Sequence, residues 1–205
     1  MAIVRYAKIA DIEYQFNSFS HQEWYKPYLE QRGSEKRRQE FTSAMVLLKE
    51  IIGIEPHIAY TEEHKPYLID SPFKITISHS KEYVCVAASE TCNVGIDIEA
   101  VAPRIDNLAQ RYMTPDEYEV FRQLQTNNSN TTNQLGTARE YATAVWCAKE
   151  AIFKIVGNAA ADFPANIQIQ SNPSDFYGIV IPYNKRIELE QITAPTGHII
   201  ILAHD

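Results

Sequence analysis

The sequence predicts an α+β protein with two similar lobes, each made of a long helix packed on a small, mainly antiparallel sheet. Three observations predict this class. Apolar residues recur at helical spacing in two long segments, at about residues 35–52 and 139–157. Short apolar runs separated by turn residues follow each segment, as is typical of neighbouring strands. With 205 residues, the chain is also long enough for two halves of about 100 residues. We therefore expect an N-terminal lobe over residues 1–100 and a C-terminal lobe over residues 101–205.

The N-terminal lobe is expected to start with a weakly alternating strand at Ile3–Lys8, followed by an irregular, aromatic-rich segment at Tyr14–Tyr28. Gly33–Ser34 then supplies the start signal of a helix at about Glu35–Ile52, and Gly53 supplies its stop signal. The apolar face of this helix is formed by Phe41, Met45, Leu48 and Ile52. The next strands are predicted at His57–Tyr60, Tyr67–Ile69, Phe73–His79, Tyr83–Ser89 and Asn93–Glu99.

The C-terminal lobe is expected to begin with two helices, at Arg104–Tyr112 and Thr114–Leu124. The second has a good start signal, because Thr114 can cap it and Pro115 suits its first position. The polar segment Asn127–Asn133 is predicted to be a mobile loop. Strands are predicted after the long helix, at Asn166–Gln170, Tyr177–Ile181, Arg186–Ile192 and His198–Ala203.

The long helix at Arg139–Gly157 combines an apolar stripe with a second face. Trp146, Glu150 and Lys154 are spaced four residues apart and therefore stack along that face. The simpler interpretation of Glu150 and Lys154 is a surface ion pair worth a few tenths of a kcal/mol. The apolar stripe consists of Tyr141, Val145, Ala148, Ile152 and Ile155, and Gly157 stands at the C-cap position.

Composition and charge limit the functional classes. The chain is 45% hydrophobic and 22% charged, which is ordinary for a globular protein. Its net charge of −7 argues against a nucleic-acid ligand. No apolar run approaches the roughly 20 residues that a membrane span requires, and no signal peptide is apparent, so we expect a cytoplasmic protein. Three cysteines without a CxxC spacing argue against both a disulfide framework and a zinc site.

Two acidic residues of the predicted strand at Asn93–Glu99 form a candidate cation site. Residues two apart in a strand share a face, so Asp97 and Glu99 lie on one face with Gly95, roughly 6–7 Å apart. Two like charges at this spacing repel each other, and a divalent cation bound through carboxylate oxygens would relieve the repulsion. Magnesium is the expected ion where phosphates complete its shell. The alternative is a solvated edge strand with two unrelated acids.

Basic residues of the N-terminal lobe allow two interpretations. Lys36–Arg38 lies in the first turn of a helix, where the dipole disfavours cations, so the group is either a solvated basic face or has an anionic partner. His79 is either a strand-end histidine with a backbone partner or a functional residue. Ser78 and His79 cannot act as a nucleophile–base pair, because adjacent strand residues face opposite ways.

Five segments together resemble the 4′-phosphopantetheinyl transferases, in order and in spacing. The resemblance is strongest for the longer, pseudo-dimeric type that activates peptide synthetases and other carrier proteins. It extends from about Glu35 to Gly157. The pair of G-[IV]-D-x-E and W-x-x-K-E-x-x-x-K at this separation is far more specific than either motif alone. The segments are HKPYL (His64–Leu68), ITISHS (Ile75–Ser80), GIDIE (Gly95–Glu99), RYMTPDEY (Arg111–Tyr118) and WCAKEAIFK (Trp146–Lys154).

This resemblance implies an enzyme that uses Mg²⁺ to transfer the 4′-phosphopantetheine arm of coenzyme A to a serine of an apo acyl or peptidyl carrier protein, releasing 3′,5′-ADP. A monomer would suffice for this, because one chain holds both lobes. Two alternatives stay open. One is a catalytically weak homologue that binds coenzyme A or a carrier protein without turnover, and the other is a magnesium-dependent phosphohydrolase.

The resemblance also implies roles for individual residues. Asp97, Glu99 and Glu150 would hold the magnesium ion, and Glu150, or a water that it orients, would take the serine proton. Lys154 would contact the pyrophosphate.

The other implied contacts are with coenzyme A and the carrier protein. His79 and Ser78 would meet the 3′-phosphate end of the nucleotide, with Lys65 close by. Lys36 lies where the family carries nucleotide-phosphate lysines. Lys149, about 100° around the helix from Glu150, is a further candidate for coenzyme A. Charge placement suggests carrier docking along Arg104–Tyr112, at Arg139 and at the loop Asn127–Asn133.

Two positions depart from the family pattern. Met45 stands where family members often have an arginine, which removes one expected contact to the nucleotide. His64 replaces the glycine of the GKP motif.

Overall fold

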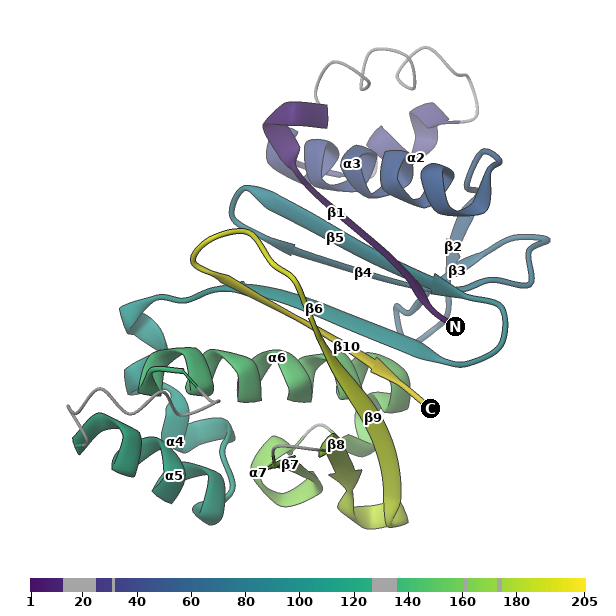
Figure 1. Ribbon diagram of the computed structural model, residues 1–205. Helices are drawn as coiled ribbons and strands as arrows, with labels where there is room; N and C mark the ends of the chain where they lie inside the picture. The colour runs from purple at the N-terminus through teal and green to yellow at the C-terminus, as the bar shows by residue number, and fades with distance from the viewer. Residues whose placement is uncertain (13–24, 31, 127–135, 161, 173–174) are drawn as a thin grey trace. The chain divides into compact units, whose positions relative to one another are not determined.

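Figure 1 shows the computed structural model of the chain, which describes residues 1–12, 25–30, 32–126, 136–160, 162–172 and 175–205. The chain forms two compact units, Met1–Cys92 and Asn93–Asp205. The predicted boundary at residue 100 therefore needs correction, because the strand that carries Asp97 and Glu99 belongs to the second unit. The class is α+β with antiparallel sheets, as predicted. The similarity of the two lobes stays a prediction.

The first unit is a three-stranded antiparallel sheet with one long helix against it (Figure 1). The strand order is β1-β5-β4, and the pair β2-β3 forms a separate two-stranded ribbon. Helix α3 packs on β5 and β1 through a shared apolar core. The elements are β1 (Ile3–Lys8), α2 (Lys26–Glu30), α3 (Glu35–Ile52), β2 (Ile58–Tyr60), β3 (Pro66–Leu68), β4 (Lys74–Ser80) and β5 (Tyr83–Ser89).

The ends of α3 follow from its capping residues. The Ser34 side chain accepts a hydrogen bond from the Arg37 backbone N–H, which satisfies a donor of the first turn. Gly53 ends the helix in the left-handed region, with φ at 75°. The predicted helix is thus confirmed. Its apolar face is confirmed as well, because Phe41, Met45 and Leu48 are buried and Ile52 is half-buried.

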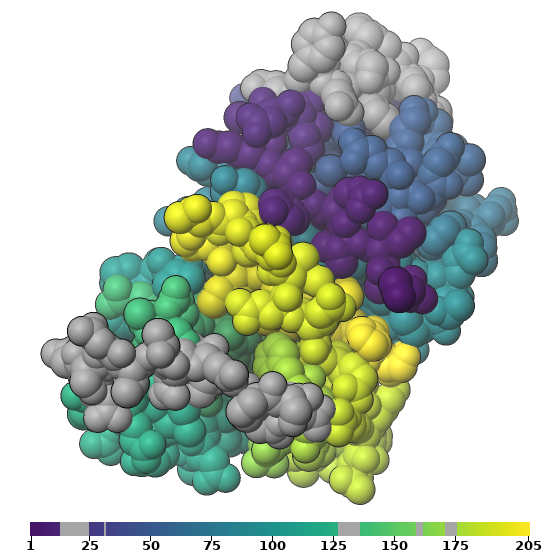
Figure 2. Space-filling view, in the orientation of Figure 1, coloured from purple at the N-terminus to yellow at the C-terminus, as the bar shows by residue number. Residues whose placement is uncertain are grey.

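The second unit is a five-stranded antiparallel sheet in the order β6-β10-β9-β8-β7, with α6 packed along β6 and β10 (Figure 1). In the space-filling view its later strands, in yellow and yellow-green, form one continuous part of the surface (Figure 2). The elements are β6 (Val94–Ala100), η2 (Pro103–Asn107), α4 (Ala109–Tyr112), α5 (Pro115–Thr126), α6 (Ala138–Val156), η3 (Gly157–Ala160), α7 (Phe163–Asn166), β7 (Ile167–Asn172), β8 (Asp175–Val180), η4 (Ile181–Tyr183), β9 (Lys185–Ile192) and β10 (His198–His204).

Helix α6 has a capping box that fixes where it begins. The Thr137 side chain accepts from the Glu140 backbone N–H at 3.2 Å, and the Glu140 carboxylate accepts from the Thr137 backbone N–H at 2.7 Å. Gly157, with φ at 69°, follows its last residue as predicted. The predicted apolar stripe packs on the sheet, with all its members buried except the half-buried Ile155. None of the described helices is long and apolar enough to span a membrane.

Short elements account for the differences from the expected pattern. The predicted helix at Arg104–Tyr112 is two pieces, η2 and α4, which meet at Leu108. Helices α2 and α7 were not predicted. The loop at Asn127–Asn133 lies outside the described residues, as does most of the segment at Tyr14–Tyr28.

Candidate functional site

Gly95 determines how closely β6 approaches α6. A β-carbon on Gly95 would lie 1.9 Å from the carbonyl oxygen of Ala151, so only glycine allows this approach. Because strand residues two apart share a face, Asp97 and Glu99 face α6 on the same side as Gly95. The shared face that the sequence predicts for these residues therefore lies against the helix that carries Glu150 and Lys154.

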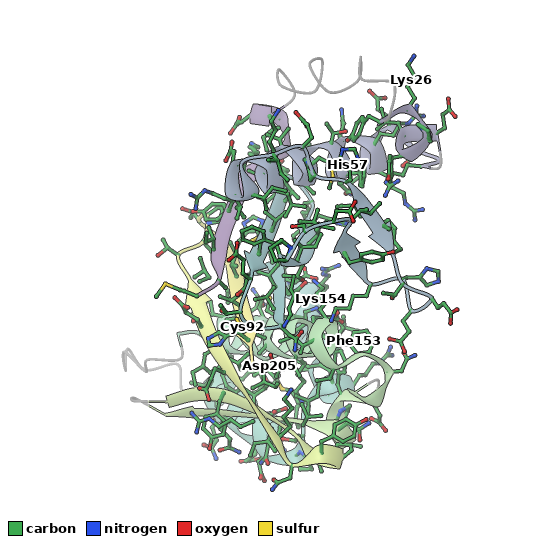
Figure 3. The ribbon with its side chains drawn as sticks, turned by 90° about the vertical axis from the view of Figure 1, so that its right-hand side faces the viewer. Lys26, His57, Cys92, Phe153, Lys154 and Asp205 are labelled. Atoms are coloured by element: carbon green, nitrogen blue, oxygen red, sulfur yellow. The ribbon has the colours of Figure 1, made fainter. Side chains whose placement is uncertain are left out.

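Lys154 joins the two elements through the first carboxylate. Its Nζ donates to Oδ1 of Asp97 at 2.9 Å and to the Ile96 carbonyl oxygen at 2.6 Å. Asp97 is buried and Lys154, labelled in Figure 3, is half-buried. A partly desolvated ion pair of this kind holds its partners more firmly than an exposed one.

Glu99 lies farther along the strand and is paired with Arg104 of η2. Arg104 donates to its Oε2 at 2.9 Å. Burial, and then the charge of Asp97, raises the pKa of Glu99, whereas Arg104 and Trp146 lower it. The carboxylate therefore lies within electrostatic reach of Asp97 and is paired with Arg104.

Glu150 is the third carboxylate of the group. Burial, followed by the negative charges of Asp97 and Glu99, raises its pKa to about 7 against the opposing charge of Lys154. Since these charges act on one another, the structure brings together the three acids and the lysine that the sequence singled out. A carboxyl group with a pKa near neutrality can both accept and release a proton at physiological pH.

The donor set can be tested against a divalent cation. Within the described part of the chain, no three His, Cys, Asp or Glu side chains are arranged as a metal-binding group. The chemistry of the set nevertheless fits a hard cation, because it consists of carboxylates whose charges raise the pKa values of Glu99 and Glu150. A cation among them would relieve that repulsion, part of which Lys154 already offsets.

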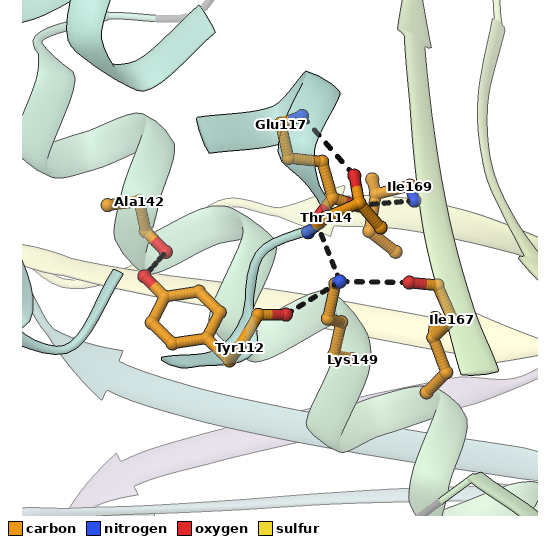
Figure 4. Close-up of polar contacts among 7 residues, drawn as sticks. All are labelled: Tyr112, Thr114, Glu117, Ala142, Lys149, Ile167 and Ile169. Carbon is orange, nitrogen blue, oxygen red and sulfur yellow. Dashed lines mark hydrogen bonds and ion pairs between the residues drawn. The ribbon is translucent and has the colours of Figure 1, made fainter. Parts of the chain in front are cut away.

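Lys149 does not fit the predicted contact with coenzyme A. Its side chain is 0% exposed, and its ammonium group forms an ion pair with Glu117, 3% exposed, at 2.7 Å (Figure 4). The same Nζ donates to the carbonyl oxygens of Tyr112 at 2.8 Å and Ile167 at 2.9 Å. All three donors are thus used inside the second unit, and the assignment of Lys149 to cofactor binding is wrong for this structure.

Glu117 completes this buried network and was not singled out in the sequence. Its Oε1 accepts from the Ile169 backbone N–H at 2.7 Å, and its Oε2 accepts from the Thr114 backbone N–H at 2.8 Å (Figure 4). The Thr-x-x-Glu spacing of a capping box was the available signal. The carboxylate thus serves helix α5, strand β7 and Lys149 together.

In the first unit, Lys36 and His79 meet at Glu40. Lys36 Nζ lies 3.5 Å from one carboxylate oxygen of Glu40, and His79 Nε2 lies 3.6 Å from the other. Glu40 is buried, whereas Lys36 and His79 are exposed. Two of the predicted phosphate-binding residues, from α3 and β4, are therefore neighbours. Glu40 was missed, although its spacing of four residues from Lys36 was visible.

The two other candidates of the first unit lie in different surroundings. Ser78 is buried and, as the strand neighbour of His79, faces the opposite side of β4. Lys65 is half-buried in the turn between β2 and β3, where its carbonyl oxygen accepts from the Thr61 backbone N–H at 3.0 Å.

Both departures from the family pattern have a structural counterpart. Met45 is 1% exposed and packs in the core of the first unit. A charged side chain at that position would need a different orientation. His64 has φ at 62°, a left-handed conformation that favours glycine.

Comparison with known proteins decides the family. The model of the 4′-phosphopantetheinyl transferase superfamily matches residues 93–197, nearly the whole second unit and its acidic site. The chain belongs to this superfamily. The predicted family is thereby confirmed.

Relatives within the superfamily show partial matches. The chain is 29% identical over 153 residues to the 4′-phosphopantetheinyl transferase HetI of Nostoc sp., covering 68% of this chain and 60% of that protein. It is 27% identical over 132 residues to AcpT of Escherichia coli K12, covering 64% of each. The chain thus spans 60 to 64% of the length of these curated relatives.

A solved structure also matches part of the chain. This is the holo-[acyl-carrier-protein] synthase from Neisseria meningitidis, with 24% identity and a TM-score of 0.40. The match covers 54% of this chain and 94% of that one.

Proposed function

We propose that the protein transfers the 4′-phosphopantetheine arm of coenzyme A to a serine of an apo acyl or peptidyl carrier protein and releases 3′,5′-ADP. The observation that carries this proposal is the group of Asp97, Glu99, Glu150 and Lys154, which interact within the region matched by the superfamily. In the reaction, the serine oxygen forms a bond to phosphorus, the phosphoanhydride bond breaks, and 3′,5′-ADP leaves with the bonding electrons.

Glu150 has the properties of the proton acceptor. Burial and neighbouring acids raise its pKa to about 7, so a large fraction is ionised at neutral pH and its basicity is greater than that of an ordinary carboxylate. It takes the serine proton directly or through a water. Lys154 supplies a positive charge next to the same acids and is assigned to the pyrophosphate oxygens.

Asp97, Glu99 and Glu150 are the proposed holders of Mg²⁺. When bound, the ion would neutralise charge that develops on the pyrophosphate during transfer. Arg104 is the ion-pair partner of Glu99, and Lys154, paired with Asp97, limits the repulsion among the acids.

The first unit is assigned to the nucleotide end of coenzyme A, in a two-lobed arrangement of the family type. Lys36 and His79 are exposed cationic or protonatable groups held side by side by the buried carboxylate of Glu40. This pair suits a phosphate dianion better than either residue alone. Ser78 and Lys65 are also assigned to the nucleotide end of coenzyme A. Met45 supplies no cation, so coenzyme A binding relies more on this pair.

Carrier docking is assigned to the segment from η2 to α4. Of its arginines, Arg104 is paired with Glu99, while Arg111 is exposed. Arg139, also predicted to dock the carrier, is paired with Asp106 at 2.6 Å. Arg111→Glu is therefore the cleaner test, because changing Arg104 also changes the surroundings of Glu99. We expect a higher carrier KM with unchanged coenzyme A KM, and unchanged carrier kinetics would contradict docking at this segment.

We also propose that the protein is a cytoplasmic monomer.

The deciding experiment is to incubate the protein with coenzyme A, Mg²⁺ and a panel of apo acyl and peptidyl carrier proteins, and then to weigh the carriers. A mass gain of one phosphopantetheine supports transfer. Free phosphopantetheine with unmodified carriers would instead indicate a phosphohydrolase. Coenzyme A binding with neither product would indicate a homologue without turnover. Asp97→Ala should abolish the transfer, and an unaltered rate would contradict the role given to the acidic group.

A further inference from the structure

A buried carboxylate is shared by the two groups that the first unit offers to a phosphate. The side chain of Glu40 is only 9% exposed, whereas those of Lys36 and His79 are 66% and 55% exposed. One carboxylate oxygen lies 3.5 Å from Lys36 Nζ, and the other lies 3.6 Å from His79 Nε2. Each group assigned to the 3′-phosphate therefore has a negative charge beside it.

The packing of the first unit explains where Glu40 stands. His79 shares a face of β4 with Ile75 and Ile77, and these two pack in the core under α3. Glu40 is the first of the buried residues of α3, which continue to Leu48. It thus stands where the apolar core ends, and its carboxylate is turned to Lys36 and His79 rather than to open water.

The charges of this group nearly cancel. Lys36 is positive and Glu40 negative, and His79 adds a positive charge only when it is protonated. The three side chains therefore present at most one net positive charge to a phosphate dianion. Arg37 and Arg38 add cations in the same turn of α3, but both are exposed, so water screens them more than it screens the buried carboxylate.

We propose that Glu40 determines specificity at the nucleotide end by weakening the hold on the 3′-phosphate, so that 3′-dephospho-coenzyme A is a second donor of the phosphopantetheine arm. This inference rests on the proposed function. The dephospho compound ends in a ribose 3′-hydroxyl, which brings no charge and can donate a hydrogen bond to a carboxylate. Dinucleotide sites discriminate in a similar way, since an acid receives a ribose hydroxyl and an arginine accommodates a phosphate.

The reaction with this second donor balances as it does with coenzyme A. The serine oxygen of the carrier forms a bond to the phosphorus that bears the pantetheine arm, and the phosphoanhydride bond breaks. The leaving group is 5′-AMP in place of 3′,5′-ADP, and it takes the bonding electrons. The serine proton passes to Glu150 directly or through a water, and the modified carrier is the same.

The test compares kcat/KM for coenzyme A and for 3′-dephospho-coenzyme A with one apo carrier protein. For the parent we expect the two values to lie within about tenfold of each other, because repulsion by Glu40 offsets much of the attraction to the phosphate. Glu40→Gln keeps the shape of the side chain and should raise the preference for coenzyme A by about tenfold, through KM. Lys36→Met leaves the acid without this cation and should shift the preference toward the dephospho compound.

Glu35→Gln is the matched control. Glu35 is an exposed acid in the first turn of α3, and it lies about 140° around the helix from Glu40. This variant changes the net charge by the same amount and should leave the preference within about twofold of the parent. An equal rise in Glu35→Gln would mean that overall charge sets the preference, and would overturn the role of Glu40.

Nucleotide binding gives a second measurement, which does not depend on turnover. In isothermal titration calorimetry, 3′,5′-ADP should bind Glu40→Gln about tenfold more tightly than it binds the parent, with the affinity for 5′-AMP little changed. Weaker or equal binding of 3′,5′-ADP by Glu40→Gln would mean that Glu40 serves only to hold Lys36 and His79 in place for the phosphate. The inference would then be wrong.

The outcomes separate this inference from the proposed function. If the parent modifies the carrier from coenzyme A but more than about tenfold less efficiently from the dephospho compound, the inference is wrong and the function stands. If the parent uses neither donor and binds neither nucleotide, the proposed function is wrong and the inference fails with it. Formation of 5′-AMP together with a carrier heavier by one phosphopantetheine supports both.

Discussion

Gly95 lies directly against the backbone of Ala151, so that the carboxylate strand and the long helix touch without an intervening side chain. This contact sets the distance between two elements that supply the acidic group. A single added β-carbon at Gly95 would disturb this contact.

Gly95→Ala is expected to destabilise the protein by about 3 kcal/mol, because the new β-carbon overlaps the Ala151 carbonyl oxygen and one backbone must move. Urea denaturation measures the loss, and transfer activity should fall in the remaining folded protein. Gly33→Ala is the control, since a β-carbon at Gly33 meets nothing within 4 Å. Equal stability of the two variants would contradict the close packing of β6 on α6.

Glu150→Gln should stabilise the protein at pH 8 by about 1–3 kcal/mol and have little effect near pH 4.5. The pKa of Glu150 is about 7 in the folded protein, against an ordinary value of 4.5 that we take for the unfolded chain. Between pH 4.5 and 7 the folded protein therefore binds more protons than the unfolded chain, and the free energy of unfolding falls as the pH rises. Glutamine does not ionise, so the variant does not lose this stability. Melting temperatures with EDTA present measure the effect.

The control for Glu150 is Glu119→Gln, at an exposed position of α5. Its change in melting temperature should be small and equal at the two pH values. A stabilisation by Glu150→Gln that is the same at pH 4.5 and pH 8 would refute the raised pKa.

Lys149→Met is expected to cost about 3–5 kcal/mol, because it leaves the Glu117 carboxylate buried without its cation. Combining it with Glu117→Gln should recover part of this loss, and a double-mutant cycle in urea gives the coupling. Coenzyme A should bind the folded Lys149→Met protein as tightly as the parent. A tenfold weaker affinity would instead favour the direct contact that the sequence suggested.

His64→Gly should stabilise the protein by about 0.5–1 kcal/mol, because glycine adopts the left-handed backbone of this turn without steric cost. His64 donates its N–H to the Thr61 carbonyl oxygen at 2.9 Å, as the last residue of a tight turn before β3. His64→Ala keeps the β-carbon and should bring no gain. Thermal unfolding compares the two, and equal gains would show that the imidazole is unfavourable rather than the backbone.

The long elements could be predicted because each carries its own local signals. Helix α3 has Ser34 and Gly53 at its ends, and α6 is followed by Gly157. In both helices the spacing of the apolar residues and the capping residues therefore predict the same bounds. The shared face of Asp97 and Glu99 followed from strand geometry alone. Helices α2 and α7 were missed because elements of four or five residues are too short to show a period.

The partners of individual side chains could not be predicted from the sequence in the same way. Lys149 stands next to Glu150 in the motif, yet one points to the acidic site and the other is enclosed with Glu117, which is far from it in sequence. Such a partner depends on how α5 packs on α6, and no local pattern encodes it. The meeting of Lys36 and His79 at Glu40 likewise depends on how α3 lies against the sheet.

The strand that carries Asp97 and Glu99 is hydrogen-bonded only to β10 in the described sheet, in which Asp97 faces Ile201 and Glu99 faces Ile199. During translation these two acids emerge from the ribosome about a hundred residues before their strand partner is made. Closing so long a loop is slow compared with forming a hairpin. We therefore expect the acidic group to assemble late in the folding of the second unit, since its strand cannot pair until β10 has been made.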